Sequence, residues 1–501
     1  MHPAPAISLA RHTALHRPAL PRWVDWPLAV ILAVLAVLLA ALAPAPLRFG
    51  ALLAYVNLLV IGGAWVYFAS RGTLEGLIPP LSLTWLAAAW PLASLYFTFA
   101  APDLEYDTLA GPRLFLFGAV RLQGVTLVFT VSYLLVVFLL QGRSVPWRTP
   151  AGTPGMDRRV GTVVLWVAMT AIAFHAVSRV APLPGLLQYA ADGGYHTLNG
   201  LMLMVGTLFT SLARRTRLTV AVFLAAAGGF YAIGNARGMA AVPIALLLVG
   251  LIFLSDLSKR WKLWTATAAL ACFPLALVIS DTTRTVTNSI GFTDLNERLG
   301  ALNEWQDVLS RTAVLTKTFG RLFFIGGHSV ITLSPEYYPY VGFSPSRYGF
   351  EFIMRMLPTR FFGDLYDSEP ANHILRLYGF VTITDVTSYP LSTVASLYML
   401  GGAVPVAVGG AFIGLFHSTV GYGLRRARLR SPYLALIVFA MIAGALLWAP
   451  NVEPISQVRT VFWDATWGVL LFRCVVRPLA GDVTQARTGV QHVRRLALHA
   501  T

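Results

Sequence analysis

Long apolar stretches alternate with short polar links along most of the chain, and this pattern predicts a bundle of membrane-spanning helices. Each stretch is near the roughly 20 residues that a helix needs to cross the hydrocarbon core of a bilayer. A helix also satisfies its own backbone hydrogen bonds, which lipid cannot do. The stretches lie at 27–44, 49–70, 80–100, 119–140, 160–178, 197–213, 218–235, 239–255, 262–280, 391–417, 432–449 and 459–475. We therefore predict an all-α polytopic integral membrane protein with about twelve transmembrane helices.

One polar segment, residues 281–390, interrupts this pattern between the ninth and tenth predicted spans. It is rich in Arg, Tyr and Phe, and its nine basic residues are all Arg except Lys317. Asp294 and Glu297 have capping-box spacing at the start of an apolar stripe, so we expect the segment to be partly helical. A loop of this size is typical of a place where binding or chemistry occurs.

The composition supports the membrane class. Hydrophobic residues make up 56% of the chain and charged residues 12%, with a mean hydropathy of +0.66. Soluble domains average about 25% charged residues. The net charge of +16 would suggest nucleic acid in a soluble protein. Here the positive-inside bias of membrane proteins explains it better, so we expect a lipid bilayer and no nucleic acid as a partner.

Threading the spans with the N-terminus inside places most Lys and Arg outside the long loop in cytoplasmic links. This predicts a cytoplasmic tail at 1–26, spans one to nine within 27–280, and a periplasmic loop at 281–390. Spans ten to twelve then lie within 391–475, followed by a second cytoplasmic tail at 476–501. Both termini are therefore predicted to be cytoplasmic.

Two polar motifs are candidates for binding or chemistry. Gly234 to Gly238 carries Arg237 at the predicted outer membrane surface, where it either faces a lipid-borne anion or merely reaches past the lipid boundary from a tight turn. In the long loop, Leu357 to Pro370 combines a basic group, carboxylates and prolines that limit backbone freedom. Such an ordered loop suits a preorganised site.

The motifs Pro358-Thr-Arg360-Phe-Phe through Glu369-Pro370, Thr387 to Gly402, and Gly234-Asn-Ala-Arg237-Gly238 occur in a recognisable order. Over about 230–415 the chain resembles the Wzy-type oligosaccharide repeat-unit polymerases, also called O-antigen polymerases. Elsewhere the likeness rests on hydropathy. The chain departs from the family pattern by Thr359 between Pro and Arg, and by Ser368-Glu369-Pro370 where Lys-Pro is commoner.

The resemblance implies a glycosyltransferase at the periplasmic face of a bacterial inner membrane. The donor would be a glycan chain on undecaprenyl pyrophosphate, and the acceptor would be the terminal sugar of a lipid-linked repeat unit. A chain-length regulator in the same membrane would be a further partner.

On this basis the catalytic candidates are carboxylates and a histidine of the loop, with Asp364 first and His373 and Glu369 behind it. Guanidinium groups suit the stabilisation of a departing pyrophosphate. The residues predicted to bind it are Arg237, Arg284, Arg347, Arg355, Arg360 and Tyr398. We expect no cofactor and no metal, because several Arg can neutralise the pyrophosphate.

Three alternatives stay open. A related transferase could hold a metal ion with Asp103, Glu105 and Asp107, since hard cations prefer carboxylates. An O-antigen ligase would share the architecture and the donor. A lipid-linked oligosaccharide flippase or polysaccharide transporter would also have about twelve spans, but the internal repeats expected of a transporter are not visible.

Overall fold

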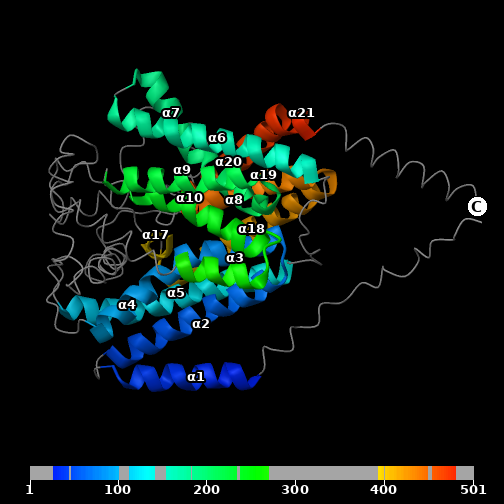
Figure 1. The fold of residues 1–501 in the computed structure, drawn as a ribbon. Coiled ribbons are helices and arrows are strands. Elements are labelled where there is room, and N and C mark those ends of the chain that lie inside the picture. The colour runs from blue at the N-terminus through cyan, green and yellow to red at the C-terminus, as the bar shows by residue number, and fades with distance from the viewer. Residues whose placement is uncertain are drawn as a thin grey trace, which may run out of the picture.

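A computed structural model of the protein describes residues 26–43, 47–100, 112–140, 154–181, 183–233, 237–269, 393–399, 401–448 and 454–480. Within these ranges the regular structure is helical, and none of these residues lies in a β-strand (Figure 1). The insertion at 281–390 and both predicted tails lie outside these ranges, apart from residue 26 of the first tail and 476–480 of the second.

The helices form two large hydrophobic clusters, which we call the first and second lobes. The first lobe contains α1 (Trp26–Ala41), α2 (Arg48–Ser70), α3 (Leu74–Leu83), the π-helical turn η2 (Thr84–Ala88), α4 (Ala89–Ala100), α5 (Pro112–Leu140), α17 (Thr393–Met399) and α18 (Ala403–Arg430). The second lobe contains α6 (Pro154–Val180), α7 (Gly185–Leu198), α8 (Leu201–Thr207), η3 (Phe209–Ser211), α9 (Arg214–Ile233), α10 (Arg237–Val249), η4 (Gly250–Leu254), α19 (Pro432–Trp448), α20 (Pro454–Leu471), η8 (Phe472–Val476) and α21 (Arg477–Ala480). Helix α1 joins the first lobe by packing on α2 through a small third cluster of Ala40, Ala43 and Ala51. Helix α3 packs on both lobes and joins them.

Several of these helices are long and apolar enough to cross a bilayer. Among the described residues there are four, namely Arg48–Ala69, Val120–Leu140, Gly155–Val180 and Ala403–Arg430. A fifth results if the bent pair Leu74–Ala88 and Trp90–Tyr96 is one span. The helical membrane class therefore agrees with the sequence prediction. The count of twelve spans stays a prediction.

The outward surface of these helices is apolar. On α5 the side chains of Val131, Leu135 and Leu139 are 51%, 58% and 75% exposed, respectively. Soluble monomers rarely expose large contiguous apolar surfaces to water. Lipid is the medium that such surfaces fit.

Two predicted spans are broken. The run 80–100 bends by 46° at the point where η2 ends and α4 begins, next to Pro91. Proline removes a helical hydrogen bond and its ring clashes with the preceding turn, which explains the bend. The run 391–417 is interrupted between α17 and α18 by Gly401 (φ 148°) and Gly402 (φ 83°), a left-handed backbone region that favours glycine.

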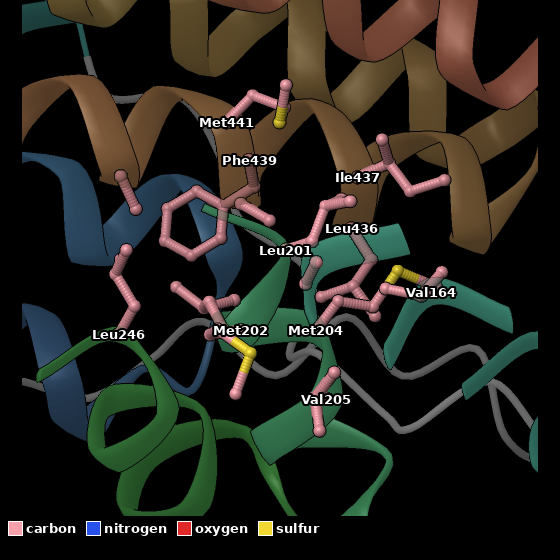
Figure 2. Close-up of a cluster of buried hydrophobic side chains, with 14 of the residues drawn as sticks. Val164, Leu201, Met202, Met204, Val205, Leu246, Leu436, Ile437, Phe439 and Met441 are labelled. Atoms are coloured by element: carbon pink, nitrogen blue, oxygen red, sulfur yellow. The ribbon is translucent and has the colours of Figure 1, made fainter. Parts of the chain in front are cut away.

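Helix α8 forms the centre of the second lobe (Figure 2). Leu201, Met202, Met204 and Val205 are fully buried between α6, α10 and α19. A short helix with no polar face can be stable only where neighbours cover all its sides.

Helices α2, α5 and α18 run in the same direction. Gly410 and Gly414 of α18 lie against the backbone carbonyls of Phe129 and Tyr133 of α5, respectively, so the contacts advance together along both helices. The contacts of α2 with α5 also advance together, from Gly50 beside Val120 to Phe68 stacked on Phe138. Between them, Asn57 donates a hydrogen bond to the Gln123 carbonyl at 3.0 Å.

Helix α10 shares this direction. Its continuation η4 brings the Phe253 ring onto Trp65, near the end of α2, with ring centroids 5.2 Å apart. The beginnings of α10 and α18 consequently lie at the same end of the bundle. We call it the Arg237 end, after the first residue of α10.

The opposite end, which we call the basic end, is where α2, α10 and α18 finish. Arg71 ends α2, Arg425 to Arg430 end α18, and Arg158 lies in the first turns of α6. Tyr433 at the start of α19 donates a hydrogen bond to Asp157, which fixes the start of α6 at this end. These described arginines, which come from three of the predicted cytoplasmic links, are therefore grouped in space.

Candidate functional site

A polar cluster joins α6, α7 and α9 at the Arg237 end. We call it the histidine cluster, and its members are His175, Arg179, Asp192, Tyr195 and Tyr231. His175 and Arg179 are four residues apart, so they share one face of α6. The rings of His175, Tyr195 and Tyr231 are buried, whereas Arg179 and Asp192 are 31% and 36% exposed. The cluster thus consists of three buried aromatic rings with two partly exposed charged side chains at their edge.

Hydrogen bonds assign the proton on the neutral His175 ring. The Tyr231 hydroxyl donates to the Ile172 carbonyl at 3.1 Å, so its oxygen accepts from His175 Nδ1–H at 2.7 Å. The other nitrogen, Nε2, then accepts from Arg179 Nε at 3.3 Å. The imidazole is held on both sides.

Asp192 completes the rim. Gln188 Nε2 donates to both carboxylate oxygens, at 3.3 and 3.2 Å. His175 Nε2 lies 3.3 Å from Asp192 Oδ1, and Arg179 lies 3.8 Å from the same oxygen. A proton added at Nε2 would therefore be received next to a carboxylate, which offsets the cost of a buried positive charge.

His196 of α7 lies behind this rim, edge-on to Tyr195, with ring centroids 5.7 Å apart. Burial lowers the pKa of His196 below its ordinary value, while the negative charge of Asp192 acts in the opposite direction. Burial thus disfavours a positive charge on the His196 ring.

The cluster also contacts the beginning of α10. The Tyr195 hydroxyl donates a hydrogen bond to the Met239 carbonyl, two residues after Arg237. The polar cluster is therefore adjacent to the helix turn that carries Arg237.

An open apolar groove of about 460 Å³ runs between α6 and α7. Its lining includes Trp166, Phe174, Ala190 and Leu198, with Thr170 as a polar member. Phe174 precedes His175, so the groove adjoins the histidine cluster. This combination suits an amphiphile with a hydrocarbon chain and a polar head.

Two of the sequence-predicted site residues lie in described helices, and both are at the Arg237 end. Arg237 begins α10, and Tyr398 is half-buried on α17, just before α18. They belong to different lobes, because Met239 packs on the second hydrophobic cluster and Tyr398 on the first. Outside the described residues lie Asp364, Glu369, His373, Arg284, Arg347, Arg355 and Arg360, and the rival acidic group Asp103, Glu105 and Asp107.

The residues of the histidine cluster are not among the site residues predicted from the sequence. A usable signal existed, because His175 and Arg179 have four-residue spacing at the end of an apolar run, as do Asp192 and His196 just before the next one. Ionisable residues in membrane helices commonly face protein rather than lipid. Their mutual partners, however, come from separate helices.

The chain matches no protein-family model, no curated protein and no solved structure. Among the residues that the structure describes, no three His, Cys, Asp or Glu side chains are grouped so as to hold a metal ion.

Proposed function

We propose that the protein is a polysaccharide repeat-unit polymerase, which transfers a glycan chain from undecaprenyl pyrophosphate to the terminal sugar of a lipid-linked repeat unit. One observation carries the proposal furthest. Arg237 at the start of α10 and Tyr398 before α18 flank the Arg-rich insertion in sequence and lie at the same end of an apolar helix bundle. Helices that precede and follow the insertion in sequence thus bring two of the proposed binding residues to one end.

The chemistry needs a proton acceptor and an anion clamp. An acceptor hydroxyl attacks the anomeric carbon of the donor, its proton passes to a base, and the bond from that carbon to the pyrophosphate oxygen breaks. Asp364 is the first candidate for this base, with His373 and Glu369 as the alternatives. The electron pair leaves with the lipid pyrophosphate.

Negative charge grows on the pyrophosphate as that bond breaks. Fixed guanidinium groups in a water-poor site stabilise such charge strongly. Arg237, Arg355 and Arg360 are the principal groups that we assign to it, with Arg284 and Arg347 in reserve. Tyr398 would orient the sugar or the phosphate.

The membrane setting follows the same proposal. The Arg237 end faces the periplasm and the basic end faces the cytoplasm, in a bacterial inner membrane crossed by about twelve spans. The apolar groove between α6 and α7 supports a lipid substrate, since it offers hydrocarbon-compatible surface beside polar groups. A chain-length regulator in the same membrane is proposed as a partner.

The proposal is tested by reconstituting the purified protein in lipid vesicles with an undecaprenyl-pyrophosphate oligosaccharide. A ladder of products spaced by one repeat unit is expected on a gel. A single transfer to lipid A-core without a ladder would identify a ligase, and movement of unextended substrate across the bilayer would identify a transporter. Either result would replace the polymerase assignment.

We expect the same reconstituted activity to tolerate EDTA, because arginines rather than a metal ion neutralise the leaving pyrophosphate. The measurement compares ladder intensity with and without chelator. Activity that is lost in EDTA and recovered with Mg²⁺ would instead favour a metal held by Asp103, Glu105 and Asp107.

A further inference from the structure

We infer that Tyr195 and His175 are positioning residues, which fix the first turn of α10 and thereby aim Arg237 at the pyrophosphate. This inference rests on the proposed function for the role of Arg237. The mechanical part, that the cluster holds the first turn of α10, stands on the contacts alone.

A proline creates the need for this contact. Pro243 lies inside α10 and has no backbone N–H to donate to the carbonyl four residues earlier, which belongs to Met239. The proline ring also pushes that carbonyl away from the helix axis. The Tyr195 hydroxyl donates to this same carbonyl. Tyr195 thus supplies the hydrogen bond that the helix cannot make for itself.

The tyrosine is itself firmly held. Its ring is buried and lies on the His175 ring, with centroids 4.4 Å apart. It also meets Tyr231 edge-on, with centroids 5.8 Å apart. A buried ring packed between two others has little rotamer freedom, so its hydroxyl defines one position for the Met239 carbonyl.

The same histidine holds the helix that precedes Arg237. His175 Nδ1 donates to Tyr231 near the end of α9 at 2.7 Å, six residues before Arg237. His175 of α6 therefore holds Tyr231, which precedes Arg237 in the chain, and Tyr195 of α7 holds Met239, which follows it. Such double anchoring sets the direction in which the first turn of α10 presents its side chains.

The decisive variant is Tyr195→Phe, which removes only the hydroxyl. We expect kcat/KM for the lipid-linked donor to fall between about tenfold and a hundredfold, the range caused by small misplacement of a binding group. Tyr133→Phe is the matched control, because Tyr133 is equally buried in the first lobe and its hydroxyl bonds His417 Nδ1 at 2.9 Å. That control is expected to keep its kcat/KM.

A second substitution separates positioning from stability. Pro243→Ala restores an N–H for the Met239 carbonyl, so it should recover the thermal stability lost in Tyr195→Phe. It does not restore the link from α10 to α7, and kcat/KM should stay low in the double variant. Recovery of both stability and kcat/KM would overturn the positioning role.

A measurement without substrate tests the mechanical part separately. A nitroxide on Arg237→Cys, in a Cys272→Ser, Cys474→Ser background, should gain mobility in Tyr195→Phe and not in Tyr133→Phe. Equal spectra in both would overturn the inference even if the polymerase is active. A gain in mobility without any glycan transfer by the unsubstituted protein would retain the tether and remove the proposed function.

Discussion

Replacing either Arg237 or Arg360 with alanine is expected to abolish polymer without reducing the amount of membrane-inserted protein. Each guanidinium is proposed to stabilise the negative charge that develops on the pyrophosphate as it departs. Removing one such preorganised donor typically costs about 10²- to 10³-fold in rate. The measurement is product-ladder intensity normalised to protein in the membrane, which separates catalysis from expression.

Two comparisons sharpen this test. Arg158→Ala removes an exposed arginine at the basic end and should leave the ladder unchanged. Arg237→Lys keeps the charge but loses the planar two-point geometry, so its product-ladder intensity should lie between those of Arg237→Ala and the unsubstituted protein. Polymer at the unsubstituted level in both alanine variants would remove the pyrophosphate-clamp proposal.

The largest expected effect on stability is that of Gly250→Ala. A Cβ at Gly250 would lie 2.2 Å from the Leu203 carbonyl oxygen and 2.8 Å from the Thr207 nitrogen, both backbone atoms of α8. A Cβ at Gly206, on the facing side, would lie 2.3 Å from the Leu247 carbonyl oxygen. Since backbone cannot rotate away, the helices must separate and open the core of the second lobe. We expect a loss of about 3 kcal/mol, the upper part of the usual overpacking range.

Gly229→Ala is the matched control on α9, where an added Cβ meets nothing within 4 Å. There the better helix propensity of alanine should stabilise the protein by up to about 1 kcal/mol. The measurement is the apparent Tm of both variants in detergent. Equal Tm values would contradict the close helix contact at Gly250.

The end of α10 that carries Arg237 depends on this close contact as well. If α8 and η4 separate, α10 can shift relative to α7, and the bond from Tyr195 to Met239 loses its geometry. A larger residue at position 250, just after the end of α10, should therefore weaken the hydrogen bond from Tyr195 to Met239 at the beginning of α10. The stability of the lobe and the position of the first turn of α10 are physically linked.

Much of the fold could be predicted from the sequence because hydrophobicity is a local property. The runs 49–70, 119–140 and 160–178 correspond to α2, α5 and α6, although α5 and α6 begin earlier than predicted, at Pro112 and Pro154. The breaks beside Pro91 and at Gly401–Gly402 were missed, since an apolar run stays apolar where its helix bends or reverses. Both breaks do have a local cause that the residues contain.

The candidate site divides in the same way. Arg237 was identified in the sequence because a charged motif between two apolar runs is conspicuous. The pairing of Asp192 with His175, and of Tyr195 with the Met239 carbonyl, depends on α6, α7 and α10 meeting at one end of the bundle. No periodicity within one helix records which residue of another helix will face it.

The sequence by itself determined the helical membrane class of the protein and the place of the Arg-rich insertion along the chain. Those features follow from the transfer of each residue between water and lipid, which depends on the residue and its immediate neighbours. Only the tertiary structure decided that α10 and α18 begin at the same end, and that Tyr195 compensates for the hydrogen bond that Pro243 removes. Those features require the directions and close contacts of helices far apart in the chain, which packing in three dimensions sets.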